Sequence, residues 1–222
     1  MPDVTLTASD GHSLSAFRLD PEGTPRGALV VIQEIFGVND HVRAVAAMYT
    51  GLGYATVAPA IFDRRQRDVR FDYSAKAHED GIALARSLDF EAVLLDLDAA
   101  VKAVAPLGNV ATIGYCLGGA LAYRTAARLP GVHAAVSYYG AQIPYFVAER
   151  PKVPVQFHLA RKDSYWPIAA AREICDAVEG AEVHDYDADH GFACDHRAPV
   201  FEPHASALAL QRTLRFLGTT IG

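Results

Sequence analysis

Short apolar runs alternate along the chain with longer segments in which apolar residues recur every three or four positions. The short runs are typical of strands covered on both faces, and the longer segments are typical of helices with one buried face. Strands are predicted at residues 4–7, 14–19, 27–33, 54–58, 110–113, 134–139, 153–159 and 181–186. Helices are predicted at about residues 39–52, 75–104 with an interruption near 87–90, 117–129, 167–178 and 200–217. This alternation predicts an α/β fold with a mostly parallel sheet of about seven to eight strands and helices on both faces.

Two segments depart from the alternation. The first two strands flank Asp10-Gly11, a dipeptide typical of hairpin turns, so they are predicted to pair antiparallel at one edge of the sheet. Residues 60–74 show no clear periodicity and are predicted to form a surface loop near the functional site. This loop carries Arg64, Arg65, Arg67 and Arg70.

A glycine-rich turn joins the strand at 110–113 to the helix that follows it. Its spacing, Gly114-x-Cys116-x-Gly118, matches the nucleophile elbow of hydrolases, with cysteine in place of serine. The elbow needs small residues two positions before and after the nucleophile, because the nucleophile has a strained backbone. The following helix directs its positive N-terminus at the thiol, and the backbone N–H of Leu117 can stabilise an oxyanion. The alternative is that Cys116 is a buried structural cysteine.

Three further reactive side chains follow predicted strands: Glu34, Asp163 and His190. Carboxyl ends of parallel strands share one edge of a sheet, so these groups and Cys116 are predicted to meet there. His190 would take the thiol proton, and Asp163 would hold its imidazole in the useful tautomer. The chain order of nucleophile, acid and histidine is that of α/β-hydrolases. Alternatively, Asp163 is a surface turn residue and Glu34 pairs with an arginine such as Arg43.

Composition narrows the class of protein. With 222 residues, 51% of them hydrophobic, the chain suits one α/β domain over residues 1–222. A net charge of −6 argues against nucleic acid or an anionic membrane as a partner. The first twenty residues contain no apolar leader, no run is long enough to span a bilayer, and three cysteines without a pairing pattern suit a reducing compartment. A cytoplasmic monomer or small homo-oligomer is expected.

Neither a metal nor a cofactor is predicted. Histidines and aspartates gather in residues 184–190 and at Asp195-His196, but adjacent strand residues point to opposite faces, and no metal-binding spacing is present. His158 lies inside a predicted strand and is expected to be a hydrogen-bonded core residue. Tyr138 and Tyr139 are also expected in the core.

Several stretches together resemble the dienelactone hydrolase (carboxymethylenebutenolidase) family. They are residues 33–39 (Gln-Glu-Ile-Phe-Gly-Val-Asn), 114–120 (Gly-Tyr-Cys-Leu-Gly-Gly-Ala), 138–140 (Tyr-Tyr-Gly), the turn at Asp163 and 190–192 (His-Gly-Phe). The resemblance implies an α/β-hydrolase fold, a triad of Cys116, His190 and Asp163, and oxyanion donors from the backbone of Leu117 and Ile35. It also implies that Glu34 holds the resting thiol and swings to help generate the thiolate when substrate binds.

The sequence departs from the family at a position that binds the substrate. The family binds a substrate carboxylate with arginines, one of them normally four positions after the catalytic histidine, and Cys194 occupies that position here. Arg197, His196 or a loop arginine such as Arg70 could supply the cation. Phe36 and Trp166 adjoin proposed catalytic groups and are candidates for the pocket wall.

The favoured hypothesis is therefore a cysteine-dependent hydrolase of a small enol-lactone or ester, such as serves aromatic compound catabolism. The missing arginine at position 194 leaves a broader carboxylesterase or thioesterase as the runner-up. A hydrolase-fold protein that binds a ligand without turnover is the alternative outside the enzyme class, although it would not need a complete triad.

Overall fold

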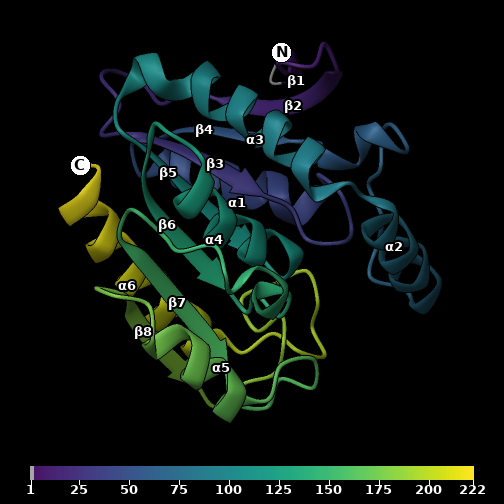
Figure 1. Ribbon diagram of the computed structural model, residues 1–222, viewed down its shortest axis with the longest axis vertical. Helices are drawn as coiled ribbons and strands as arrows, with labels where there is room; N and C mark the ends of the chain where they lie inside the picture. Colours follow the sequence, from purple (N-terminus) through teal and green to yellow (C-terminus); the bar gives the residue numbers. More distant parts are fainter. Residues whose placement is uncertain (1–2) are drawn as a thin grey trace.

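An eight-stranded sheet forms the centre of the molecule (Figure 1). The computed structural model describes residues 3–222. Its strands are β1 (Asp3–Thr7), β2 (Ser13–Leu19), β3 (Ala28–Ile32), β4 (Ala55–Pro59), β5 (Val110–Tyr115), β6 (Val132–Tyr138), β7 (Val155–Ala160) and β8 (Glu182–Tyr186). They are arranged in the order β1-β2-β4-β3-β5-β6-β7-β8. The hairpin β1–β2 is antiparallel and pairs with β4 at one edge, while the pairs from β4 to β8 are parallel, as predicted.

Six α-helices connect the strands. They are α1 (Asp40–Gly51), α2 (Ala75–Ser87), α3 (Phe90–Val104), α4 (Leu117–Arg128), α5 (Ile168–Asp176) and α6 (Pro203–Thr220). The predicted interruption near 87–90 is present because Asp89 caps α3, accepting hydrogen bonds from the backbone N–H groups of Glu91 and Ala92. The last helix begins later than predicted, since Glu202 caps it by accepting from Ala205 N–H. Pro167 caps α5 rather than lying in its first turn.

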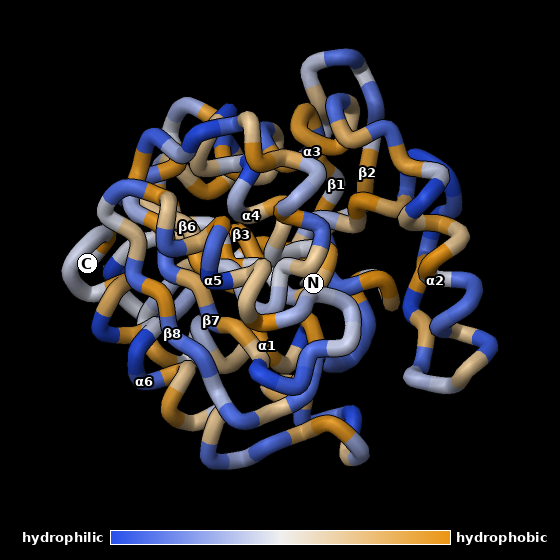
Figure 2. The backbone as a smooth tube through the Cα atoms, turned by 60° about the horizontal axis from the view of Figure 1, so that its bottom comes forward, coloured by the Kyte–Doolittle hydropathy of each residue, from blue (hydrophilic) through white to orange (hydrophobic). Residues whose placement is uncertain are grey.

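The helices cover the two faces of the sheet in separate layers. Residues of α3, α4 and α5 pack into one buried apolar cluster with the inward side chains of the sheet. Residues of α1 and α6 pack into a second cluster on the opposite face (Figure 1). The strands β3, β4 and β5 are buried at every position, which explains their continuous apolar runs, and Figure 2 shows the polar residues mostly on the outer segments.

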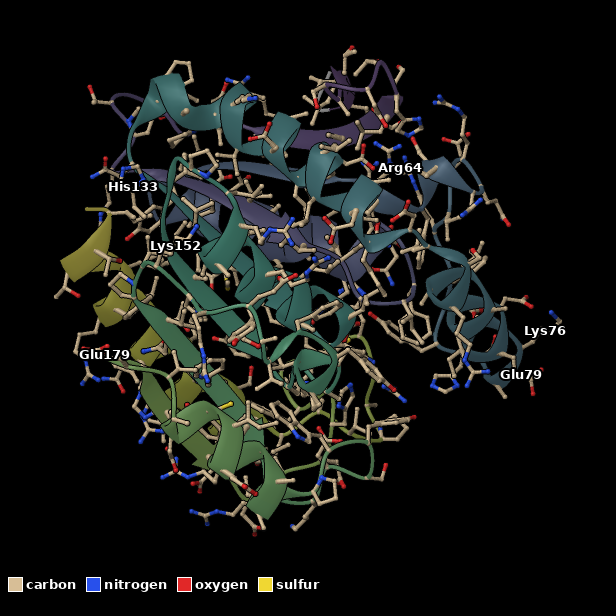
Figure 3. All side chains as sticks on the ribbon, viewed as in Figure 1. Arg64, Lys76, Glu79, His133, Lys152 and Glu179 are labelled. Carbon is tan, nitrogen blue, oxygen red and sulfur yellow. The ribbon has the colours of Figure 1, made fainter. Side chains whose placement is uncertain are left out.

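Helix α2 stands apart from these layers, at the side of the molecule (Figure 1). Its residues Lys76 and Glu79 point outward into solvent (Figure 3). Its Gly81 contacts the loop after β3 so closely that a Cβ atom there would lie 2.3 Å from the Ile35 carbonyl oxygen. Helix α2 is therefore fixed by backbone contact above the carboxyl end of β3. No helix within residues 3–222 is both long and apolar enough to cross a membrane.

Candidate active site

The predicted strand–turn–helix is present around Cys116. This residue precedes the first residue of α4 and has φ 54° and ψ −117°, a strained conformation for a residue other than glycine. The flanking glycines allow the close packing: a Cβ atom on Gly114 would lie 1.8 Å from the Gly118 carbonyl oxygen, and one on Gly118 would lie 2.2 Å from that of Ile32. The strain projects the half-buried Cys116 side chain beyond the carboxyl end of β5.

The glycine requirement can be tested by stability. Gly114→Ala is expected to lower the free energy of unfolding by about 3 kcal/mol or more, or to prevent folding, because backbone rather than a flexible side chain blocks the new methyl group. Gly51→Ala is the matched control, since no atom lies within 4 Å of its Cβ position at the end of α1. Urea unfolding followed by circular dichroism measures both variants. Equal stabilities would contradict the steric account of the elbow.

Asp163 and His190 come together at the ends of neighbouring strands. His190 Nδ1 lies 2.8 Å from Asp163 Oδ2, and both side chains are buried. The other oxygen, Asp163 Oδ1, accepts hydrogen bonds from the backbone N–H groups of Tyr165 at 2.8 Å and Trp166 at 3.2 Å. Asp163 is therefore not a solvated turn residue: its carboxylate is oriented by the main chain and faces the imidazole.

The His190 imidazole interacts with charge on both sides. Burial by itself would lower the pKa of His190, but the charge of Cys116 and the hydrogen bond to Asp163 outweigh it and raise the pKa to about 10. The ring packs between Tyr139, at a centroid distance of 5.0 Å, and Tyr165, at 4.9 Å. The charged form of His190 is thus favoured beside Asp163 and Cys116, an arrangement suited to general acid–base chemistry.

A cavity of about 390 Å³ opens above these groups. Cys116, His190 and Glu34 line it together with Leu117 and Ile35, whose backbone N–H groups are the predicted oxyanion donors. Leu117 is the first residue of α4, where an N–H has no acceptor within its own helix. The opposite wall comes from α2 and α3, with apolar side chains such as Ile82 and Phe90. Every residue of the predicted catalytic and oxyanion set except Asp163, which lies behind His190, therefore borders one cavity.

Glu34 is buried at the wall of this cavity. Its side chain is hydrogen-bonded by the Tyr73 hydroxyl, at 3.4 Å from Oε2. The alternative partner, Arg43, lies elsewhere and pairs with Asp3 at 2.7 Å. Glu34 is thus available to the cavity rather than held in an ion pair with Arg43.

Two of the three predicted pocket residues do not line the cavity. Phe36 does, and it packs edge-on against Tyr73 at a centroid distance of 4.6 Å. Trp166 is 4% exposed and belongs to the apolar core, because the turn that lets its N–H reach Asp163 directs its side chain inward. Arg70 pairs its main chain with Gly37 and lies 3.9 Å from Asp3. Contrary to the prediction, Trp166 and Arg70 are therefore not placed to bind a substrate in this cavity.

The cations that do border the cavity are Arg86 on α2 and Arg197 in the turn after β8. Within residues 3–222, no carboxylate lies within 4.0 Å of either guanidinium. By contrast, Arg64 of the arginine loop is bound to the buried Asp96 at 2.7 Å and serves the fold. Arg197 was among the candidates predicted from the sequence, whereas Arg86 was missed. A helical pattern shows which residues share a face of α2, but it does not show that this face borders a cavity formed with other elements.

Two residues of the cavity lining are joined by a polar contact. The Tyr165 hydroxyl lies 3.2 Å from Nε2 of His78, so the turn after β7 is joined to α2. Neither residue stood out in the sequence.

The remaining aromatic and histidine predictions agree with the structure. His158 is buried, and its ring nitrogens contact Tyr186 at 2.8 Å and Gln156 and Thr213 at 2.9 Å. Burial lowers its pKa well below the ordinary value, so it is a neutral core residue. Tyr138 and Tyr139 are also buried, and Tyr139 additionally supports the His190 ring.

Comparisons with known proteins identify the family. The dienelactone hydrolase family matches residues 14–221. A carboxymethylenebutenolidase of Pseudomonas putida is 34% identical over 96% of this chain and 94% of its own length. Carboxymethylenebutenolidase 1 of Cupriavidus pinatubonensis is 32% identical over 96% of this chain and 95% of its own.

Solved structures show the same fold. A dienelactone hydrolase of Anabaena variabilis superposes with a TM-score of 0.72 at 18% identity, covering 99% of this chain and 97% of its own. A dienelactone hydrolase-like promiscuous phosphotriesterase from metagenomic libraries has a TM-score of 0.70 at 22% identity, covering 99% and 98%. The chain thus has the α/β-hydrolase fold, and it belongs to the dienelactone hydrolase family, whose members are hydrolases of ester or lactone bonds.

Proposed function

We propose that this chain hydrolyses a small enol-lactone or ester through a thioester on Cys116. The observation that carries the proposal is that Cys116 and His190 line one cavity, while His190 Nδ1 lies 2.8 Å from the buried Asp163 carboxylate behind it. This arrangement meets the requirements of nucleophilic catalysis: a nucleophile, a base beside it and a third group that orients the base.

The steps follow from the positions of these groups. The Cys116 thiolate attacks the substrate carbonyl, and the backbone N–H groups of Leu117 and Ile35 stabilise the resulting oxyanion. The C–O bond breaks while the protonated His190 delivers its proton to the leaving oxygen, which in a lactone stays attached to the acyl group. A water then attacks the thioester as His190 takes its proton, and the C–S bond breaks to release the acid and restore Cys116.

Glu34 is proposed to control the nucleophile. Its carboxylate and the thiol share the cavity wall, and it has no cationic partner within 4.0 Å in the described chain. A carboxylate in that position can accept the thiol proton when substrate fills the cavity, so that the reactive thiolate forms mainly when it is needed.

The cavity also suggests the kind of substrate. Apolar side chains form one wall, while Arg86 and Arg197 bring two positive charges to the same space, with no carboxylate of residues 3–222 within 4.0 Å of either guanidinium. Arginine binds carboxylates through paired hydrogen bonds. We infer that the substrate carries a carboxylate held by these arginines instead of by one at position 194, which favours the enol-lactone acid over a neutral ester.

The substrate assignment is tested with one lactone in two forms, the free acid and its methyl ester. The double variant Arg86→Gln/Arg197→Gln is expected to raise KM for the free acid by about 10- to 100-fold, because hydrogen bonds to a charged group contribute roughly 1.5–3 kcal/mol. KM for the methyl ester should change less than about threefold. Arg150→Gln, an exposed arginine outside the cavity lining, is the control.

Other outcomes select the alternatives. If the parent hydrolyses the methyl ester or p-nitrophenyl acetate as well as the acid, the protein is a broader esterase or thioesterase. If the parent binds the lactone without turning it over, the ligand-binding alternative is correct.

A further inference from the structure

A buried group of three potential metal ligands lies behind the active-site cavity. Glu34, His41 and Cys194 each offer a ligand atom, and these atoms all lie within 4.8 Å of one another. The three residues come from the loop after β3, the first turn of α1 and the turn after His190, and they are only 3%, 2% and 0% exposed. Burying a carboxylate, an imidazole and a thiol side by side costs free energy unless hydrogen bonds or opposite charges offset the loss of water. The cluster therefore needs an explanation.

The imidazole of His41 is oriented as a metal ligand. Its Nδ1 lies 3.3 Å from Asp195 Oδ1, and a carboxylate in this position keeps the proton on Nδ1. Its Nε2 is buried and has no hydrogen-bond partner among residues 3–222. The lone pair of Nε2 is therefore free, and the atom is shielded from the surrounding solvent.

The other two groups lack a positive partner. Among residues 3–222, the Glu34 carboxylate has one side-chain hydrogen bond, from Tyr73 at 3.4 Å, and no cationic side chain lies within 4.0 Å of it. Cys194 is a free and fully buried thiol, and its sulfur lies within 4.8 Å of the ligand atoms of Glu34 and His41. A cation between these groups would stabilise both of them as anions.

We propose that Glu34, His41 and Cys194 bind one zinc ion. The charges balance, since Zn²⁺ is neutralised by one carboxylate and one thiolate, and binding releases the Cys194 proton to solvent. Zinc accepts this combination of oxygen, nitrogen and sulfur ligands in tetrahedral geometry, with bonds of about 2.0–2.3 Å that place ligand atoms roughly 3.5 Å apart. The atoms in the structure need to move inward by about one ångström, and water completes the fourth position.

The site would regulate the enzyme through Glu34. A carboxylate bound to zinc cannot accept the Cys116 proton, so occupied enzyme would be held in its resting form. This consequence rests on the proposed function of Glu34, whereas zinc binding itself does not.

Two other donor sets compete for zinc and must be separated from this site. Cys116 and His190 could bind zinc in the active site, and His41 could bind it with the exposed Asp195 and His196. The experiment therefore uses Cys116→Ala as the background, which removes the first set. His196→Ala in that background tests the second set.

Zinc affinity is measured by competition with a chromophoric chelator. The background variant Cys116→Ala and the double variant Cys116→Ala/His196→Ala are each expected to bind one Zn²⁺ per chain, with equal affinity. Adding Cys194→Ser or the isosteric Glu34→Gln is expected to weaken binding by at least about 100-fold. Cobalt(II) in the background variant should show a thiolate-to-metal charge-transfer absorption that Cys194→Ser removes.

Circular dichroism and thermal unfolding identify any variant that has lost its fold. If Cys194→Ser does not fold, the zinc affinity of Glu34→Gln tests the proposal instead. The proposal is overturned if the background variant binds no zinc, if both ligand variants retain its affinity, or if only His196→Ala loses it. None of these readouts requires turnover, so they remain decisive even if the proposed hydrolase activity is absent.

Discussion

Cys116→Ala is expected to reduce kcat/KM for the preferred lactone by about 10⁴-fold or more. The thiol is the atom that forms the acyl bond, and removing the nucleophile of a catalytic triad leaves only the contribution of the oxyanion donors and of substrate binding. Intact-mass measurement after rapid acid quench should show the acyl adduct on the parent during turnover and no adduct on the variant. The wild-type cavity and fold are expected to persist, because the substitution only shortens a half-buried side chain.

Cys175→Ala is the matched control for this experiment. Cys175 is a fully buried thiol of α5 with a pKa raised to a value far from neutrality by burial, so it serves packing and not chemistry. Its replacement should leave kcat/KM within about threefold of the parent and lower stability modestly. Parent-like turnover by Cys116→Ala would refute the thioester mechanism.

Asp163→Asn is expected to lower kcat by about 10³- to 10⁴-fold while the protein remains folded. The amide oxygen can still accept the two N–H groups of Tyr165 and Trp166, but the amide nitrogen cannot accept a hydrogen bond from His190 Nδ1. The imidazole then loses the tautomer in which Nε2 faces the substrate, the effect known for the aspartate of serine protease triads. Single-turnover kinetics and thermal unfolding measure the two properties separately.

The pH profile distinguishes this role from a structural one. The Asp163 carboxylate contributes to the raised pKa of His190, so the pKa of His190 is lower in Asp163→Asn. The protonated His190 serves the leaving oxygen and is lost as the pH rises through its pKa. The alkaline limb of the rate profile should therefore move to lower pH in the variant. Asp187→Asn, which alters an exposed ion pair with Lys162, should leave the profile unchanged.

Local patterns were sufficient to predict most of the fold. The continuous apolar runs became strands because each is buried on both faces, and the break between α2 and α3 was visible because Asp89 is a capping residue. The nucleophile elbow was predictable because its requirement is also local: side chains at Gly114 and Gly118 would collide with backbone a few residues away or on the adjoining strand.

The two arginines of the cavity show where such patterns stop being informative. Arg86 resembles any exposed residue of a polar helix, and it faces the cavity only because the contact of Gly81 with Ile35 positions α2 over the end of β3. The contrast between Tyr165 and Trp166 has a similar cause. Both adjoin Asp163, yet the turn that hydrogen-bonds its carboxylate sends one ring to the cavity and the other into the core.

By itself, the sequence determined the α/β order of elements, the elbow at Cys116 and the placement of Glu34, Asp163 and His190 at strand ends. These features depend on periodicity, turn chemistry and the common direction of parallel strands, all of which act over short stretches of chain. Only the tertiary structure decided which cations face the cavity and that Glu34, His41 and Cys194 gather behind it. Those side chains lie on segments distant in sequence, and their meeting depends on how separate elements pack.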